Sequence, residues 1–375
     1  MILKRVGLTN FRNWRQGAVE FARGVTVLWG ANGDGKTNLL ESVVLACAGR
    51  GLRAGADSEM ITWGEQEGWV RVLLESRLRG TLDIRLRLGA SGRVLTVNAT
   101  PRSFSALIGM VGLVYFCPED VGIAKGEPAD RRRFLDVEIG LLSRPYYFNL
   151  IRYRRVLEQR NRALKDLRDG RGNERALAAW DEPLAVSGAS VMRRRKRFLA
   201  DLAGPADQAS VRLCGCRLSL GYEPGLEIVP EDENQAREAF LSALSAGRAE
   251  DISRGLTTLG PHRDDFAILS GSVDVRKFGS EGEQRTAAVA LRLGLLNVIE
   301  AALEEPPLLL LDDVMSELDQ TRRQGLTEAI SQAEQVIVTC TDAPMLPQAL
   351  ANAARLVRIE AGRAAGQAVT ESAAR

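Results

Sequence analysis

The sequence predicts an α/β fold with an inserted all-helical arm, and three features of the chain lead to this expectation. A β-branched run at Gly24–Leu28 precedes a glycine-rich turn and an amphipathic pattern over Lys36–Ala48. Far along the chain, the all-aliphatic run Leu308–Leu311 has the pattern of a buried parallel strand. Between them, apolar residues at heptad spacing from Leu150 to Leu167 predict a helix.

The glycine-rich turn has the pattern of a phosphate-binding loop. It matches G-x-x-x-x-G-K-[ST] at every fixed position, with residues Gly30, Ala31, Asn32, Gly33, Asp34, Gly35, Lys36, Thr37 and the following Asn38. Glycines permit the positive φ angles that turn N–H groups toward phosphate oxygens, and a helix N-terminus adds partial positive charge. We expect Lys36 to reach the β- and γ-phosphates of ATP and the Thr37 hydroxyl to bind Mg²⁺.

Two aspartates end the aliphatic run. Carboxylates at the end of a buried strand are costly unless a cation offsets their charge, and Mg²⁺ with its phosphates would do so. Asp312 is therefore the candidate Mg²⁺ ligand, and Asp313 is the candidate group that orients or deprotonates the attacking water. Together with Lys36 they form the candidate catalytic set.

A serine-containing segment, Ser280 to Gln284 (SEGEQ), stands between a β-like stretch, Ser272–Phe278, and a helix expected over Gln284–Glu300. A hydroxyl and N–H groups at a helix start can bind an anion. Serine followed three residues later by glutamate is also an ordinary helix cap. The position of the segment upstream of the acidic strand favours the anion-binding interpretation.

The expected organisation has three parts. Residues 1–121 form the first half of an ATPase lobe, with antiparallel strands at Trp69–Ser76, Thr81–Leu88 and Arg93–Asn98. Residues 122–205 form the helical arm, in which Asp169–Asn173 is a loop and Leu184, Val191 and Phe198 mark a returning helix. Residues 206–375 form the second half, including a strand near Val336–Asp342 and an Ala/Gly-rich tail, 361–375, expected to be disordered.

Charge is unevenly distributed along the chain. Residues 122–205 carry 19 lysines and arginines against 11 acidic residues, a net charge of +8, which leaves −6 for the rest of a chain whose total is +2. Dense basic runs are usually solvated helix faces. Beside the predicted ATPase lobe, these runs are also candidates for phosphate contacts with duplex DNA. The candidate residues are Arg131, Arg132, Arg193, Arg194, Arg195 and Lys196. Aromatic residues make up 5% of the chain, so a single-strand stacking surface is less expected.

The remaining composition agrees with a cytoplasmic, nucleoid-associated protein with no membrane contact. We find no run of 18 uninterrupted apolar residues and no signal-like N-terminus. The five cysteines are scattered and expected to be reduced thiols, and His262 is the single histidine, which excludes a histidine-cluster metal site.

The order of these motifs is similar to that of ABC-type ATPase heads, including the SMC family, and the chain more narrowly resembles the RecF family of bacterial recombinational-repair ATPases. The resemblance spans Leu8 to about Asp342. The residues that carry it are Leu8–Asn13, Gly30–Asn38, Pro118–Asp120, Lys125–Gly126, Arg131–Asp136, Thr258–Asp265, the SEGEQ segment and Asp312–Asp319.

The resemblance implies a site shared by two subunits. In such heads the S-x-G-x-Q segment of one subunit covers ATP bound on the other, which implies a homodimer when ATP is bound. Ser280, Gly282 and Gln284 would act in trans, and Asp319 would lie at the dimer seam. Arg12 resembles the arginine near the nucleotide in SMC-type heads.

Three departures from the general ABC pattern indicate slow turnover. The catalytic carboxylate is Asp313 where glutamate is more usual. Val336–Asp342 lacks the usual histidine, which leaves Thr339 or Thr341 as candidate γ-phosphate contacts, and Pro118–Asp120 lacks the coupling glutamine. We therefore expect a weak, DNA-stimulated ATPase whose hydrolysis acts as a switch.

The resemblance further implies that ATP closes a dimer on duplex DNA near single-strand/double-strand junctions and that hydrolysis reopens it. With RecO and RecR as partners, such a protein would assist loading of the RecA recombinase, with links to replication restart and the SOS response. Two alternatives remain. The chain could be an ABC transporter ATPase subunit, which the basic arm and missing glutamine disfavour, or a non-hydrolysing, ATP-gated DNA clamp.

Overall fold

The computed structural model describes residues 1–49, 57–227, 229–331, 333–341 and 354–365, and the chain divides into two compact units. Unit 1 contains Met1–Asp120, Pro205–Cys216 and Ala288–Arg375. Unit 2 contains Val121–Gly204 and Arg217–Ala287. Each unit is therefore assembled from segments that are distant in the sequence.

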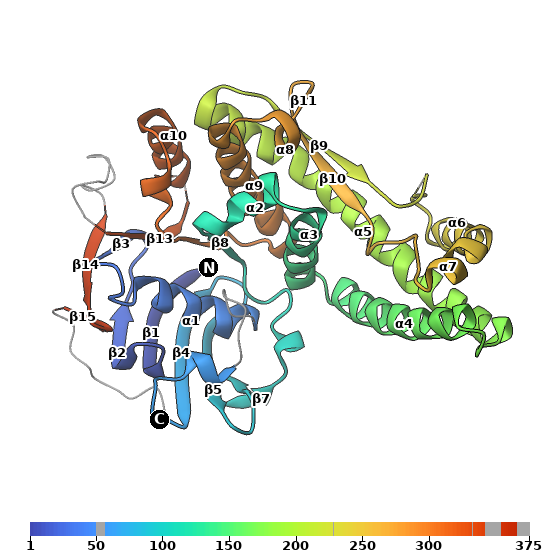
Figure 1. Ribbon diagram of the computed structural model, residues 1–375. Coiled ribbons are helices and arrows are strands. Elements are labelled where there is room, and N and C mark those ends of the chain that lie inside the picture. Colours follow the sequence, from blue (N-terminus) through green and yellow to red (C-terminus); the bar gives the residue numbers. More distant parts are fainter. Residues whose placement is uncertain (50–56, 228, 332, 342–353, 366–375) are drawn as a thin grey trace. The chain divides into compact units, whose positions relative to one another are not determined.

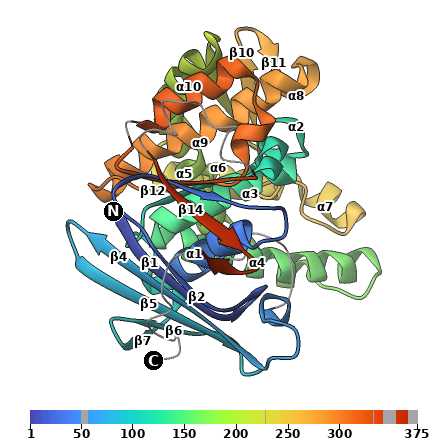
Figure 2. The same cartoon turned by 90° about the vertical axis from the view of Figure 1, so that its left-hand side faces the viewer.

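The described residues of unit 1 form two six-stranded sheets (Figures 1 and 2). The antiparallel sheet has the order β2–β1–β4–β5–β6–β7, with β1 (Ile2–Phe11), β2 (Trp14–Glu20), β4 (Glu67–Ser76), β5 (Gly80–Gly89), β6 (Val94–Val97) and β7 (Thr100–Arg102). The second sheet has the order β15–β14–β3–β13–β12–β8, with β3 (Gly24–Trp29), β8 (Leu113–Phe116), β12 (Leu308–Leu311), β13 (Gln335–Cys340), β14 (Arg355–Glu360) and β15 (Arg363–Ala364). In it, every neighbouring pair is parallel except β14 and β15.

Helix α1 (Lys36–Ala48) links the two sheets of unit 1. It contacts β1, β4 and β5 of the antiparallel sheet and β8 of the other. Leu40 and Val43 of this helix are fully buried in one core with Val6 and Leu310. Helix α10 (Gln320–Ser331) and most of α9 (Glu281–Leu303) also belong to this unit.

Unit 2 is mainly helical and contains a small antiparallel sheet in the order β11–β10–β9. Its strands are β9 (Leu218–Glu223), β10 (Asp265–Ser270) and β11 (Val273–Asp274). Its helices are α2 (Gly122–Lys125), α3 (Pro128–Leu142), α4 (Arg144–Arg168), α5 (Glu174–Cys214) as far as Gly204, α6 (Glu233–Ala246), α7 (Arg248–Arg254) and α8 (Val275–Phe278). Helices α4 and α5 form the arm, joined by the predicted loop (Figure 1).

Several predicted elements are confirmed. Helix α1 has the predicted bounds, and β12 is a buried strand parallel to both neighbours. The three expected antiparallel strands are β4, β5 and β6, with ends shifted by one or two residues. These elements were predictable because their apolar spacing is local and strong.

The expected boundaries of the arm and tail were wrong. Residues 217–287, assigned to the ATPase lobe, group with 121–204. Helix α5 continues through Pro205 to Cys214, and the end of the arm therefore belongs to unit 1. Within the expected disordered tail, Arg363–Ala364 pairs with β14, while residues 366–375 lie outside the described part.

The prediction of a β-like segment over Ser272–Phe278 was also wrong, except at its second and third residues. Val273–Asp274 is strand, but Val275–Phe278 is a helical turn. The Asp274 carboxylate accepts hydrogen bonds from the N–H groups of Arg276 (3.0 Å) and Lys277 (3.2 Å). This side chain caps the turn and stops the strand, a local competition that aspartate is known for.

Helix α9 is long and apolar enough to cross a membrane by length and composition, although 61% of its apolar window is buried inside the protein. Such burial is typical of a core helix.

Arg160 interrupts the apolar heptad spacing between Leu150 and Leu167 in the arm, and its side chain is fully buried. It forms ion pairs with Asp181 (2.8 Å) and Asp251 (2.6 Å) and donates to the Thr257 hydroxyl (2.8 Å). The arginine thus joins three separate segments of unit 2.

His262 has a structural role in unit 2. Its Nε2–H donates to the Thr257 carbonyl (2.9 Å), which leaves Nδ1 to accept from the Tyr153 hydroxyl (2.6 Å). Both bonds require the neutral ring in this arrangement. Burial lowers the pKa of His262 from 6.5 to about 4.

Acidification should therefore destabilise the protein through His262. Below about pH 6.5 the unfolded ring binds a proton that the folded ring refuses until about pH 4, so stability falls as pH decreases through this window. Between pH 7 and pH 5 the loss should be about 2 kcal/mol. Urea unfolding of wild type and His262→Gln at both pH values measures it. An equal loss in the variant would contradict this assignment.

Candidate nucleotide-binding site

The phosphate loop connects β3 to α1 and depends on glycine at a crowded position. Gly35 has φ 102°, and a Cβ atom there would lie 2.5 Å from Asn13 Oδ1 and 2.7 Å from Trp14 Nε1. A larger residue would meet both backbone strain and a clash. The Lys36 side chain is buried, and its Nζ donates to the carbonyls of Gly30 (2.7 Å) and Ala31 (2.8 Å).

Asp312 is the centre of the site. It is 5% exposed at the end of β12, and its carboxylate accepts hydrogen bonds from Thr37 Oγ1 (2.9 Å), Thr339 Oγ1 (2.7 Å) and the Tyr115 hydroxyl (3.0 Å). Tyr115 lies in β8, Thr339 in β13 and Thr37 in the first turn of α1, so the bonds hold the edge of the sheet to the phosphate loop. Burial and the Asp312 charge raise the pKa of Tyr115 well above its usual range, so it stays a donor.

The donor set fits Mg²⁺. Within the described residues, Asp312 has hydroxyl partners but no lysine or arginine partner, so its buried negative charge is uncompensated by protein. Mg²⁺ is commonly held by one carboxylate and one hydroxyl together with nucleotide phosphates. Thr37 and Asp312 would supply the protein ligands, as the sequence predicts.

A cavity of about 170 Å³ adjoins this centre. It is lined by Asn32, Gly33, Gly35, Lys36, Thr37, Asn38, Asp312, Asp313, Thr339 and Thr341. The structure therefore brings most of the predicted loop residues together with the acidic pair. Asp313 has a left-handed backbone (φ 51°), and its N–H donates to Thr339 Oγ1 (2.9 Å).

Two predicted nucleotide contacts have other partners. The Asp34 carboxylate accepts from the Ala361 N–H (3.1 Å), and its carbonyl accepts from the Gly362 N–H (2.8 Å), so the residue ties the loop to the β14–β15 turn. The Arg12 guanidinium forms a two-point ion pair with the buried Glu41 (3.0 Å) and donates to the Glu59 carbonyl. Neither residue lines the cavity.

Sequence reasoning missed two residues that support the loop from behind. Trp14 is fully buried, and its Nε1–H donates to the Gly35 carbonyl (3.0 Å). Asn13 Nδ2 donates to the Gly33 carbonyl (3.0 Å), and Asn38 Nδ2 donates to Asn13 Oδ1 (2.9 Å). Asn13 lies in the β1–β2 turn and Trp14 is the first residue of β2, both far from the loop in sequence, so no local pattern signals these contacts.

The signature segment lies in unit 2 and forms a helix cap. The Ser280 N–H (2.7 Å) and hydroxyl (2.8 Å) both donate to Glu283 Oε2, and the Glu283 N–H donates back to Ser280 Oγ (3.3 Å). The ordinary capping interpretation is therefore correct for this conformation. Gln284 Nε2 donates to the carbonyls of Val275 (3.2 Å) and Arg276 (3.4 Å).

Two further predicted positions are engaged locally. Asp319 is exposed, and hydrogen bonds from Arg322 lower its pKa. In the segment that lacks a coupling glutamine, Asp120 accepts from Arg292 (2.6 Å) and from the Cys117 N–H (3.0 Å). Asp120 is therefore a structural ion-pair partner within unit 1.

Several arginines of the predicted DNA surface are buried. Arg131 and Arg195 are each 2% exposed, and they pair with Asp265 (2.6 Å) and Asp136 (2.6 Å). Both were wrong as DNA contacts. The other candidates are partly buried and bonded within unit 2: Arg132 to the Asp264 carbonyl, Arg193 to Glu233, Arg194 to Ser143 and Lys196 to Glu231.

The charge excess of the arm is reduced by its own unit. Residues 217–287 carry 8 lysines and arginines against 13 acidic residues, a net charge of −5, so unit 2 as a whole carries +3. Ion pairs between the two segments include Arg131–Asp265, Arg160–Asp251, Arg195–Asp264, Lys196–Glu231 and Arg237–Glu182. Much of the basic excess therefore stabilises the unit.

Comparison with known proteins identifies the family of this chain. A family model described as the RecF/RecN/SMC N-terminal domain matches residues 2–365. A curated relative from Clostridium tetani, "DNA replication and repair protein RecF", is 35% identical over 96% of this chain and 99% of its own length. The chain belongs to the RecF family. Its fold is accordingly an ABC/SMC-type P-loop ATPase head with an inserted helical arm.

Solved structures agree with the family. A structure titled as the recombination mediator protein RecF–ATP in the RecFOR pathway is 32% identical, with a TM-score of 0.87 over 98% of this chain and 97% of its own. An SMC head bound to the C-terminal winged-helix domain of ScpA is 16% identical, with a TM-score of 0.57 over 97% of this chain and 96% of its own. The second likeness concerns the fold alone.

Removing the indole N–H behind the loop should weaken ATP binding. Trp14→Phe keeps most of the buried volume but removes one of the two donors to the Gly35 carbonyl, which then keeps only the Leu39 N–H (3.0 Å), at a cost of about 0.5–1.5 kcal/mol. If that cost falls on the loop, ATP affinity should decrease by up to about tenfold, measured by calorimetry. Trp63→Phe, at an almost fully exposed site, is the matched control. Equal affinity in both variants would contradict a supporting role for Trp14.

Proposed function

We propose that this chain is an ATP-dependent DNA-binding protein of recombinational repair, in which ATP pairs two copies on duplex DNA and slow hydrolysis separates them. The observation that carries the proposal is the buried Asp312 centre joined to the phosphate loop. Membership in the RecF family supports the repair role, because the relatives are named DNA replication and repair proteins. RecR and RecO are the partners, with RecA downstream.

The chain's own residues suit slow hydrolysis. Lys36 would donate to the β- and γ-phosphates, and Thr37 and Asp312 would hold Mg²⁺, which neutralises charge that develops on the phosphates. The Asp313 carboxylate would orient the attacking water, with less reach than a glutamate. Thr339 Oγ1 is already bonded to Asp312 and to the Asp313 N–H, so Thr341 is the better candidate for contacting the γ-phosphate.

The signature segment would complete a site on a second copy. Ser280, Gly282 and Gln284 would face the partner's nucleotide, and Asp319 would lie at the seam. A phosphate at Ser280 would displace the Glu283 carboxylate, which now accepts both the N–H and the hydroxyl of Ser280. Because a phosphate of the partner's ATP would replace the Glu283 carboxylate at this helix cap, closure of the dimer would depend on ATP bound to the partner.

Sedimentation tests the trans site. Wild type should form dimers with ATP and Mg²⁺, whereas Lys36→Met should stay monomeric because its loop binds the phosphates poorly. Ser280→Arg should bind ATP normally yet stay monomeric, because the larger side chain blocks the approach of the partner. Ser331→Arg, on an exposed helix end, should dimerise like wild type. An ATP-dependent dimer of Ser280→Arg would overturn the model.

DNA contacts are better assigned to exposed cations of the arm. Arg152 and Arg155 lie on the exposed face of α4, and neither side chain has a hydrogen bond or ion pair in the described part of the chain. They can therefore meet backbone phosphates without breaking an internal bond. Contacts of this kind carry no sequence preference.

Replacing Arg152 and Arg155 together by glutamine should weaken duplex binding for all sequences. The slope of log affinity against log salt should become shallower by roughly 1.8, about 0.9 for each lost contact. Arg254→Gln removes an exposed arginine that is paired with Glu250 on α7 and serves as the control. A slope unchanged by the double variant would exclude this face.

The two alternatives make separable predictions. A transporter ATPase subunit would bind membrane partners and no DNA, and membership in the RecF family argues against it. A non-hydrolysing clamp would dimerise with ATP and bind DNA without turnover. Phosphate release with and without duplex, in wild type and Asp313→Asn, distinguishes it from the switch proposed above.

A further inference from the structure

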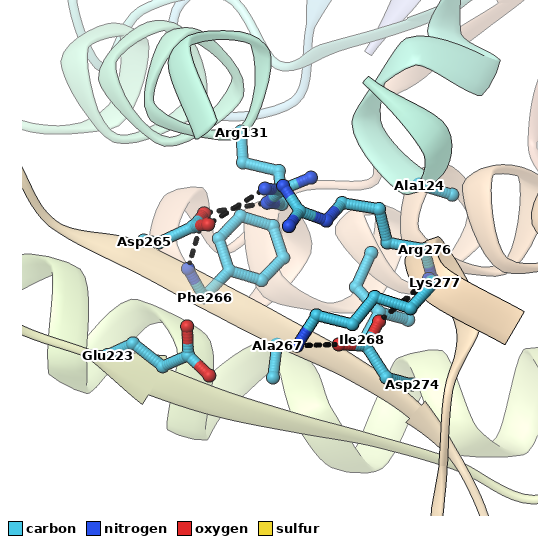
Figure 3. Close-up of a pocket in the computed structure, with 10 residues that line it drawn as sticks. All are labelled: Ala124, Arg131, Glu223, Asp265, Phe266, Ala267, Ile268, Asp274, Arg276 and Lys277. Atoms are coloured by element: carbon cyan, nitrogen blue, oxygen red, sulfur yellow. Dashed lines mark hydrogen bonds and ion pairs between the residues drawn. The ribbon is translucent and has the colours of Figure 1, made fainter. Parts of the chain in front are cut away.

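A small polar cavity lies within unit 2 among α2, α3, α8 and the β9–β10–β11 sheet (Figure 3). Its volume is about 50 Å³, room for a single small group and too little for a nucleoside. Charged side chains dominate the lining. Three are cationic and three are carboxylates: Arg131, Arg276 and Lys277, with Glu223, Asp265 and Asp274.

Two of the cations are neutralised by neighbouring carboxylates. Arg131 binds both oxygens of Asp265 (2.6 and 2.7 Å), and its third donor goes to the Gly126 carbonyl (3.0 Å). Lys277 Nζ lies 3.3 Å from Asp274 Oδ2. These pairs account for four of the six charges.

Arg276 is the exception. Its guanidinium is partly buried and points into the cavity toward Arg131 (Figure 3). Among the described residues, no hydrogen bond or ion pair reaches this guanidinium. Glu223, which carries the remaining charge, projects from β9 on the opposite side of the cavity and is exposed, so solvent screens it.

Because Asp265 offsets the charge of Arg131, Arg276 is the cation of this cavity that lacks an anionic partner among the described residues. Arginine has five N–H donors, of which Arg131 uses three, so two remain available there, and all five of Arg276 are available. A planar donor fork matches the oxygens of a phosphate. We propose that this cavity binds one phosphate group, held by Arg276 with the remaining donors of Arg131.

The cavity is lined by α8, which directly precedes the segment that carries Ser280 and Gln284. Arg276 belongs to α8, whose carbonyls at Val275 and Arg276 accept from Gln284 Nε2. Ser280 follows two residues after α8 ends. A phosphate that fixes Arg276 would therefore also fix the segment that carries Ser280 and Gln284. This consequence rests on the proposed function, whereas phosphate binding itself does not.

The group could come from inorganic phosphate or from the backbone of a nucleic acid, and the experiment separates these sources. The full chain carrying Lys36→Met is used, so that the phosphate loop contributes little. Inorganic phosphate should slow hydrogen exchange of residues 275–284 by up to about tenfold at ten times its Kd, because exchange must await ligand release.

Adding Arg276→Gln should abolish this protection. Adding Arg276→Lys should preserve part of it, because lysine keeps the positive charge but lacks the planar N–H donors of the guanidinium. Arg171→Gln, in the arm loop, is the control for loss of one charge and should leave it intact. Protection that survives Arg276→Gln would overturn the proposal. A circular-dichroism spectrum equal to that of the parent verifies that each variant is folded.

The second arm of the test uses a short duplex in phosphate-free buffer. If a backbone phosphate enters the cavity, the duplex should protect residues 275–284, and Arg276→Gln should reduce the log–log salt slope by about 0.9. Protection by inorganic phosphate alone identifies the free ion as the ligand. Protection by neither would contradict the site, whereas failure of duplex binding with intact phosphate protection would contradict only the proposed function.

Discussion

The buried carboxylate of Asp312 is the interaction on which the ATPase half of this protein depends. It stands at the end of an all-leucine strand, where removal from water would be costly without donors or a cation. Three hydroxyl groups reach it from distant parts of the chain, on Thr37, Tyr115 and Thr339. The same carboxylate therefore organises the protein's site and leaves its charge for a metal to neutralise.

The phosphate loop is held by hydrogen bonds from residues packed behind it as well as by its bond to Asp312. Asn13 and Trp14 bind loop carbonyls, and Asp34 binds the β14–β15 turn. These contacts use the loop's carbonyls and an acidic side chain, and they leave its N–H groups available for anions. A loop held in this way loses little conformational entropy when it binds a nucleotide.

The sequence alone predicts the glycine loop with α1, the strand β12 and the helix α4, because glycine spacing, the aliphatic run and the heptad pattern are local signals. It does not predict the division into units, since Arg160 and Arg131 find their carboxylates about a hundred residues away. For the same reason, the prediction that Arg131 and Arg195 of the basic segment contact DNA was wrong. Charge counted along a segment cannot distinguish Arg195, buried beside Asp136, from Arg152, which faces solvent.

Calorimetry of ATP binding to wild type and Asp312→Asn, each with Mg²⁺ and with EDTA, tests whether Asp312 binds Mg²⁺ at the phosphate loop. The amide keeps the size of the side chain and can still accept from Thr37, but it lacks the charge that binds the metal. Mg²⁺ should strengthen ATP binding to wild type and not to the variant, while the affinities measured with EDTA should be similar. An equal Mg²⁺ effect in both proteins would contradict it.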